Sequence, residues 1–325
     1  MQKGPLVSVV LPNYNYSTYI QKRIEGILAQ TYPYLELILL DDKSTDNSVE
    51  IMRRYESHPK VSTIIVNEEN SGSPFVQWEK GISLAKGKYI WIAEADDEAL
   101  PDFLKSCVEA LQANPSASIC YTSSVHIDSN DVVVPHRHKP TRTEGYSVFN
   151  GMEFARRNLY WRCYIENASG AVFRRDAYDR IQSREWINMR SSGDWLFWSL
   201  LALEGDVIRI HTPLNRFRIH TSSVTANAKK RVRKYLEDAY IINTIEEKLQ
   251  PPVSRYRHCM RTGQLYRFIR KYVDPEQKQS AISGVKAILH EPYWIRHLEA
   301  LNRILRWIPF TASMKRDALP DTYTW

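Results

Sequence analysis

The chain has 325 residues, of which 43% are hydrophobic and 25% charged, a balance typical of a soluble globular protein. No apolar run comes near the ~18 residues that a membrane-spanning helix needs, and no secretory leader is recognisable. The four cysteines form no CxxC pair, which argues against a zinc knuckle or a redox motif and favours a cytoplasmic location. The net charge of +7 comes from residues 226–325, which hold 19 Lys and Arg and 10 Asp and Glu. We therefore expect this region to form either a solvated basic surface or a binding site for an anionic partner. Nucleic acid is not the expected partner, because the sequence has no arginine-rich run and no zinc finger.

Short apolar runs alternate with helical patterns along the first 125 residues. Strands are expected at residues 6–11, 35–40, 61–66, 89–93 and 117–124. Helices are expected between them at residues 17–30, 44–56 and 74–85, with a fourth beginning at Pro101. Such alternation is typical of βαβ units, so this half of the chain should form a mostly parallel sheet.

The alternation ends beyond residue 125. In chain order we expect a hairpin turn at 128–131, a surface loop at 135–147, a strand at 170–173, a helix at 193–203, and strands at 207–210 and 214–219. From about residue 228 the pattern is helical, with breaks at Pro251-Pro252, Pro275 and Pro292. We therefore expect an α/β domain over residues 1–225 and a basic helical region over residues 226–325.

Two strands of the first half run directly into carboxylates. The strand at 89–93 is followed by Glu94, Asp96 and Asp97, and the strand at 35–40 by Asp41 and Asp42. Adjacent carboxylates repel one another, and a hard divalent cation such as Mg²⁺ or Mn²⁺ removes that repulsion. Because the carboxyl ends of parallel strands share one edge, the two clusters outline a ligand site there. The alternative for each cluster alone is a solvated turn.

Five segments together resemble the family 2 glycosyltransferases. They are VSVVLPNYN at 7–15, DDKSTDNS at 41–48, AKGKYI at 85–90 leading to Asp96-Asp97, SGDWLFW at 192–198 and RFRIHTSSV at 216–224. The likeness covers roughly residues 5–225, in order and with consistent spacing. It implies an α/β protein with the GT-A fold, in which helices flank a single Rossmann-like, nucleotide-binding mixed sheet. The nucleotide-sugar-binding half would cover residues 1–125 and the acceptor half residues 126–225, followed by a helical C-terminal extension.

The resemblance implies a nucleotide site after the first two strands. Tyr14 would stack on the base, with Pro12 and Asn15 in the same loop. Asp42 would accept a hydrogen bond from the imide N–H of uracil or thymine, although the amide edge of guanine fits a carboxylate acceptor equally well. The alternatives are a buried aromatic residue at a strand end and an aspartate that caps the next helix.

The same resemblance implies a metal site at the second acidic cluster. Asp97 would coordinate Mn²⁺ or Mg²⁺ directly, and Asp96 would contact the ribose or the water shell of the metal. His220 would reach the diphosphate or complete the metal shell, while Arg218 would support phosphate charge or pair with an acid. Glu94 occupies the position of the first acid in the usual DxD pattern.

Asp194 matches the catalytic base of the family, which removes a proton from the acceptor hydroxyl during a single inverting displacement. The alternative is a helix N-cap, because an apolar helical run follows. One departure concerns the loop at 70–78, where many members carry an Arg-Asn pair. Here Gln77 and Lys80 are the nearest polar candidates, so the family's contacts in that loop do not transfer.

The expected activity is therefore metal-dependent, inverting transfer from a nucleotide-diphosphate sugar to a hydroxyl of a glycan or lipid-linked acceptor, with UDP-sugar favoured. The expected setting is assembly of bacterial cell-surface polysaccharide. The alternative is a non-catalytic GT-A scaffold or glycan-binding subunit of a polysaccharide assembly complex. The presence of both the acids and the base argues against that alternative.

A basic amphipathic pattern recurs at residues 294–308. Such a helix would either lie on an anionic membrane or pack against the catalytic domain or a second subunit. The first possibility predicts a peripheral protein on the inner face of the membrane, suited to a lipid-linked acceptor.

Overall fold

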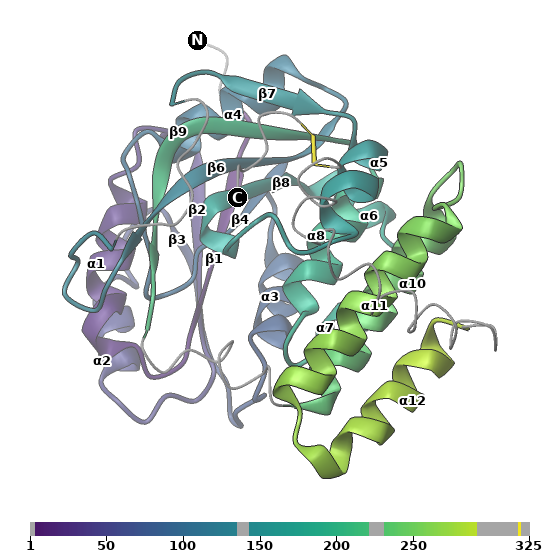
Figure 1. Cartoon of the computed structure of the whole chain (residues 1–325). Coiled ribbons are helices and arrows are strands. Elements are labelled where there is room, and N and C mark those ends of the chain that lie inside the picture. The colour runs from purple at the N-terminus through teal and green to yellow at the C-terminus, as the bar shows by residue number, and fades with distance from the viewer. Residues whose placement is uncertain (1–3, 135–142, 221–230, 291–317, 320–325) are drawn as a thin grey trace.

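A computed structural model describes residues 4–134, 143–220, 231–290 and 318–319 (Figure 1). They form a nine-stranded mixed sheet in the order β3-β2-β1-β4-β8-β6-β9-β5, with β7 paired to β9. The strands are β1 (Val7–Asn13), β2 (Leu35–Asp41), β3 (Val61–Val66), β4 (Tyr89–Ile92), β5 (Glu98–Ala99), β6 (Ala117–Ile127), β7 (Tyr146–Phe149), β8 (Ala171–Arg174) and β9 (Asp206–Arg218).

Helices cover both faces of the sheet. They are α1 (Ser17–Leu28), α2 (Ser48–Arg53), α3 (Pro74–Leu84), α4 (Phe103–Ala113), α5 (Gly151–Phe154), α6 (Arg175–Arg180), α7 (Glu185–Asn188), α8 (Gly193–Leu203), α10 (Val232–Lys248), α11 (Arg255–Tyr272) and α12 (Lys278–Ile288). Short turns of other helix types lie at Ala155–Leu159, Ala168–Gly170 and Pro275–Gln277. Figure 1 shows α10, α11 and α12 as an outer layer beside α3, α7 and α8.

The first four strands are parallel, as the alternating pattern predicts. In the register, Asn13 of β1 is opposite Asp41 of β2, and Val10 is opposite Ile92 of β4. The carboxyl ends of β1, β2 and β4 therefore meet at one edge of the sheet, and the residues after them are brought together there.

The second half of the sheet corrects one expectation. The two strands expected at 207–210 and 214–219 are a single strand, β9, which pairs with β6 in parallel. Proline cannot donate to a strand ladder, and the register shifts on both sides of the pair formed by Ser123 and Pro213. These irregularities absorb the proline, so the strand continues through it.

Two further boundaries differ from the sequence prediction. The helix expected at 44–56 covers only Ser48–Arg53, because Asp46 Oδ1 accepts a hydrogen bond from the Ser48 amide (3.0 Å) and shapes a turn before it. The loop expected at 135–147 gives way to β7 at Tyr146, while residues 135–142 lie outside the described part. The hairpin at 128–131 is confirmed, with the Asp128 amide donating to the Val132 carbonyl (2.9 Å).

Two apolar layers form the core, one on each face of the sheet. Neighbouring strand residues point to opposite faces, so Val9 packs in the layer of α1 and α4, and Val10 packs in the layer of α3 and α8. The second layer continues into the C-terminal region through Ile242, Leu265 and Val285. The C-terminal helices thus extend the core of the sheet, while the boundary expected at residue 225 falls outside the described residues.

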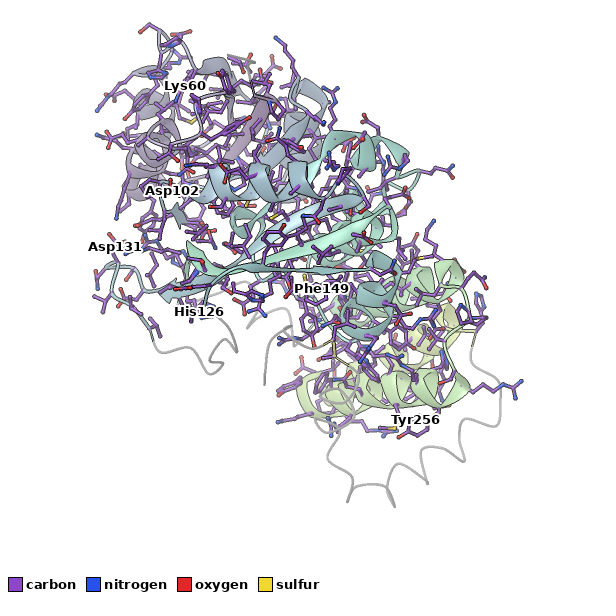
Figure 2. All side chains as sticks on the ribbon, turned by 90° about the horizontal axis from the view of Figure 1, so that it is seen from above. Lys60, Asp102, His126, Asp131, Phe149 and Tyr256 are labelled. Atoms are coloured by element: carbon purple, nitrogen blue, oxygen red, sulfur yellow. The ribbon has the colours of Figure 1, made fainter. Side chains whose placement is uncertain are left out.

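The exposed side chains of the C-terminal helices include aromatic and basic groups. Figure 2 shows Tyr256 of α11 on the opposite side of the view from Asp131, and Tyr256 is 60% exposed.

Among the described residues, no helix has both the length and the apolar character to cross a bilayer. The amphipathic pattern at 294–308 lies outside the described residues.

Candidate active site

The loops after β1 and β2 are tied together by hydrogen bonds. Asp41 Oδ2 accepts from Asn13 Nδ2 (2.7 Å) and from the Ser44 hydroxyl (2.6 Å), while Asn15 Oδ1 accepts from the Thr45 amide (2.8 Å). Both side chains, Asp41 and Asn15, therefore hold the loops in place.

Within these loops, Tyr14 remains free to contact a ligand. Its side chain follows β1 directly and is 47% exposed, whereas Pro12 before it is buried. Lys43, in the facing loop, has a backbone φ of 63°, in the left-handed region that glycine adopts most easily. An exposed aromatic ring on a fixed loop is a suitable platform for a flat base.

Asp42 lies at the centre of a buried polar network. Its Oδ1 accepts from Asn67 Nδ2 (2.7 Å), the Ser71 amide (2.9 Å) and Gln77 Nε2 (2.9 Å), and its Oδ2 accepts from the Ser71 hydroxyl (2.8 Å). A carboxylate offers about four lone-pair sites, so Oδ2 retains capacity for one more donor. The sequence indicated Gln77 only as a polar candidate and missed Asn67 and Ser71.

The second acidic cluster, Glu94, Asp96 and Asp97, follows β4. Asp97 is buried and accepts from Asn167 Nδ2 (2.7 Å) and the backbone amide of Arg218 (2.9 Å). Glu94 Oε1 accepts from Trp78 Nε1 (2.8 Å). The structure thus brings the acids that follow β4 together with a residue of β9 and one of the segment before β8.

Asp96 contacts the predicted histidine. Its Oδ2 lies 2.8 Å from His220 Nε2, and the His220 ring packs near Tyr16, the N-cap of α1, and near Tyr19 within α1, with ring centroids 6.3 and 6.2 Å away. Burial and the nearby Asp96 raise the pKa of Tyr16, so its hydroxyl stays protonated. The two tyrosines were not predicted, although their spacing of three residues at the start of a helix places them on one face.

The cluster carries more negative charge than its protein neighbours neutralise. Burial and then the Asp96 charge raise the pKa of Glu94 to about 8, and the same two causes raise the pKa of Asp97. Arg23 of α1 is buried nearby, its guanidinium 5.0 Å from the Trp91 ring centroid, and it acts in the opposite direction on both acids. Repulsion among buried carboxylates is the situation that a bound cation relieves.

The donor types fit Mg²⁺ or Mn²⁺. In the part of the chain that the structure describes, no three acidic, histidine or cysteine side chains converge as a complete metal-binding set. A Mg²⁺ ion needs only one or two protein carboxylates when water molecules and substrate phosphates supply its other ligands. Asp96 and Asp97, with His220 beside Asp96, are the residues that would hold the ion.

Arg218 anchors the acidic loop. Its Nε donates to the Asp96 carbonyl (2.7 Å), and its Nη2 contacts Asp131 (2.6 Å) and Glu98 (3.3 Å). Lys22 of α1 contacts the same two acids. Of the two roles expected for Arg218, phosphate support and pairing with an acid, the second is therefore seen in the structure.

Asp194 occupies the first turn of α8. Ser192 is the N-cap, so the alternative of Asp194 as the cap is wrong. Burial raises the pKa of Asp194 to about 6, against the opposing effects of the Trp195 amide and Lys234. A partly buried carboxylate with a pKa near 6 is deprotonated at neutral pH and still basic enough to accept a proton.

Close packing links this helix to the acidic cluster. A Cβ on Gly193 would lie 2.6 Å from the Trp186 carbonyl and from the Phe75 ring, so a larger residue does not fit. Phe75 packs edge-on against Trp78, with centroids 5.3 Å apart, and Trp78 donates to Glu94. The segment at 70–78, noted above only as a departure from the family pattern, therefore connects all three parts of the site.

The chain is similar to several known proteins in sequence and in fold. The sequence model of Glycosyl transferase family 2 matches residues 8–182, more than half of the chain, and ends before Asp194 and His220. The putative teichuronic acid biosynthesis glycosyltransferase TuaG of Bacillus subtilis is 34% identical over 113 residues, 35% of this chain and 44% of TuaG. The uncharacterized glycosyltransferase alr2836 of Nostoc is 25% identical over 216 residues, 66% of this chain and 65% of alr2836. The chain thus spans less than two thirds of either relative.

Solved structures share the fold. Staphylococcus aureus TarS 1–349 in complex with UDP-GlcNAc superposes with a TM-score of 0.67 at 16% identity, covering 95% of this chain and 91% of that one. The mannosyltransferase PcManGT from Pyrobaculum calidifontis, in complex with GDP-Man and Mn²⁺, gives a TM-score of 0.52 at 19% identity, with 96% and 83% covered. The chain therefore has the GT-A fold and belongs to glycosyltransferase family 2.

Proposed function

We propose that this chain transfers a sugar from a nucleoside-diphosphate sugar, with a UDP-sugar favoured, to an acceptor hydroxyl. The observation that carries the proposal is that Asp42, the acidic cluster and the exposed Tyr14 all follow the carboxyl ends of the neighbouring parallel strands β1, β2 and β4. The remaining acceptor capacity of Asp42 suits the imide N–H of uracil. TarS, a neighbour in fold, was solved with UDP-GlcNAc, which supports the class of donor.

The diphosphate would lie against the acidic cluster with Mn²⁺ or Mg²⁺ held by Asp97 and Asp96. When bound, the cation neutralises the charge that develops on the departing nucleoside diphosphate. His220, whose Nε2 lies 2.8 Å from Asp96 Oδ2, would contact either the phosphates or the ion. PcManGT, another neighbour in fold, was solved with GDP-Man and Mn²⁺, which supports the use of a divalent metal.

Asp194 would act as the general base. As the acceptor oxygen attacks the anomeric carbon from the face opposite the diphosphate, its proton passes to the Asp194 carboxylate. The new C–O bond forms as the bond to the diphosphate oxygen breaks, and a single displacement inverts the anomeric centre. The two acidic groups thus have separate roles, one at the leaving group and one at the nucleophile.

The acceptor we propose is a growing glycan or a lipid-linked glycan of the bacterial cell surface. The names of two relatives support this class: TuaG is described as a putative teichuronic acid biosynthesis glycosyltransferase, and an Escherichia coli relative, 33% identical over 129 residues, as a chondroitin synthase. A lipid-linked acceptor would place the chain at the inner face of the membrane, where the basic C-terminal region suits an anionic surface.

Nucleotide binding gives the direct test of the donor site. UDP with Mn²⁺ should raise the melting temperature more than dTDP, GDP or CDP, and UDP without Mn²⁺ should have a much smaller effect. A ligand at 100 times its dissociation constant adds about 2.7 kcal/mol of stability, which differential scanning fluorimetry detects readily. If none of the four nucleotides shifts the transition, the non-catalytic scaffold becomes the better interpretation.

The rate should depend on pH through Asp194. Because burial raises the pKa of this carboxyl to about 6, the fraction of active, deprotonated base grows as the pH rises from 5 to 7. At saturating donor and acceptor, kcat should therefore be near half its maximum at about pH 6. The charged and titratable groups around Asp194 are Lys234, Asp238 and Cys163.

The control for this pH profile is the dissociation constant of UDP across the same range. A kcat that stays constant down to pH 4.5, with UDP binding intact, would contradict the assignment of Asp194 as a base with a raised pKa.

A further inference from the structure

An acidic side chain of the C-terminal region holds the loop that precedes Asp194. The carboxylate of Glu237 on α10 accepts hydrogen bonds from three consecutive backbone amides, those of Arg190 (2.8 Å), Ser191 (2.8 Å) and Ser192 (3.1 Å). Glu237 is buried. Ser192, the N-cap of α8, makes no capping bond with its own side chain, and the Glu237 carboxylate adds a negative charge at this helix start beside that of Asp194 in the first turn.

A second acid on the same helix reinforces this contact. The Ser192 hydroxyl donates to Asp238 Oδ1 (2.8 Å), and Lys234 Nζ contacts Asp238 Oδ2 (2.6 Å). Arg233 Nε donates to Glu237 Oε1 (3.0 Å) and its Nη2 to the Asn188 carbonyl (2.7 Å). One face of α10 therefore fixes the chain from the end of α7 to the start of α8.

We propose that Glu237 is a positioning residue for the base Asp194, acting through the loop at 190–192. The inference rests on the proposed function. A general base acts over hydrogen-bond distances, and displacement of a catalytic group by about 1 Å costs on the order of 100-fold in rate. The loop at 190–192 leads directly into the first turn of α8, so its position sets where the Asp194 carboxylate lies.

The packing of α10 does not depend on this carboxylate. Its buried apolar residues, Ile241, Ile242 and Ile245, lie in the same core layer as α8. Removing the Glu237 side chain should therefore free the three amides of the loop, and loosen it, while α10 stays in place. This separates a positioning role from a general contribution to folding.

The test compares Glu237→Ala and Glu237→Gln with Glu247→Ala, an exposed glutamate on the same helix that serves as the matched control. In Glu237→Ala we expect kcat to fall about 10- to 100-fold and the donor KM to stay within about twofold. Glu237→Gln keeps one acceptor oxygen and should lie between wild type and Glu237→Ala.

Two further measurements separate this role from a structural one. The apparent pKa in the kcat profile of Glu237→Ala should move downward, because a released base is better solvated. Amide hydrogen exchange at residues 190–192 should accelerate, while exchange at residues 197–203 stays slow. Glu247→Ala should match wild type in every measurement.

Several results would overturn the proposal. A Glu237→Ala variant with wild-type kcat, measured beside an inactive Asp194→Asn, removes the positioning role and leaves the proposed function standing. A fall in kcat that only follows the folded fraction, with the pH profile unmoved, shows a structural role instead. If wild type transfers sugar from no donor, the proposed function fails and the positioning role fails with it.

Discussion

Asp194→Asn should greatly slow sugar transfer while leaving nucleotide binding intact. The amide has the shape of the carboxylate but cannot accept the proton of the acceptor hydroxyl, and loss of a general base typically costs about 10²–10⁴ in rate. Turnover of a UDP-sugar, measured as UDP release, should fall by this factor. The melting shift produced by UDP and Mn²⁺ should equal that of wild type.

Asp176→Asn is the matched control, because Asp176 occupies the same second position of α6 that Asp194 occupies in α8, but is exposed. It should transfer sugar at the wild-type rate. Burial raises the pKa of Asp194 to about 6, above that of an unfolded aspartate, so ionisation of this carboxyl destabilises the folded state. This destabilisation develops as the pH rises from about 4 to about 6 and is fully present at higher pH. Asp194→Asn should therefore melt no lower than wild type at pH 8. Equal losses of nucleotide binding and transfer would identify Asp194 as structural.

The second large effect is expected at Asp97. Asp97→Asn removes one negative charge from the cluster that would hold the cation but keeps a side chain of the same shape beside Arg218 and Asn167. A metal ion contributes several kcal/mol of charge stabilisation, so turnover should fall by about two orders of magnitude or more. The part of the UDP melting shift that requires Mn²⁺ should disappear.

Chelation of wild type should reproduce this phenotype, and added Mn²⁺ should reverse it in wild type but not in Asp97→Asn. Asp102→Asn, at an exposed carboxylate that follows the same loop, should behave as wild type. If Asp97→Asn retains a full Mn²⁺-dependent shift, the cation is held elsewhere.

The parallel half of the fold follows from local sequence alone. The runs at 37–40 and 89–93 are apolar throughout because both faces of these strands are covered, and such runs show directly in the sequence. The acidic residues after these strands could be predicted as a site for the same reason, because a charged cluster after an apolar run is recognisable from the local sequence alone.

What the sequence did not reveal depends on distant contacts. Asn67 and Ser71 bind Asp42 only after β3 has paired with β2, and Glu237 meets residues 190–192 only after α10 has packed on the core. No local pattern distinguishes these polar residues from solvated ones. The continuity of β9 through Pro213 was missed because proline usually ends a strand, and the irregular pairing with β6 that accommodates it is a tertiary feature.

The position of β8 between β4 and β6 has a consequence for synthesis on the ribosome. β4 ends at Ile92, but its neighbour β8 begins only at Ala171, so a nascent chain exposes the edge of β4 while about eighty further residues are made. Asp97 then gains its remaining partners when Asn167 and Arg218 emerge. Non-local pairing of this kind slows folding and leaves strand edges open to association. The acidic cluster is therefore among the last parts of the sheet to be completed, and a chain interrupted before residue 218 carries Asp96 and Asp97 without the contacts to Arg218 that order them.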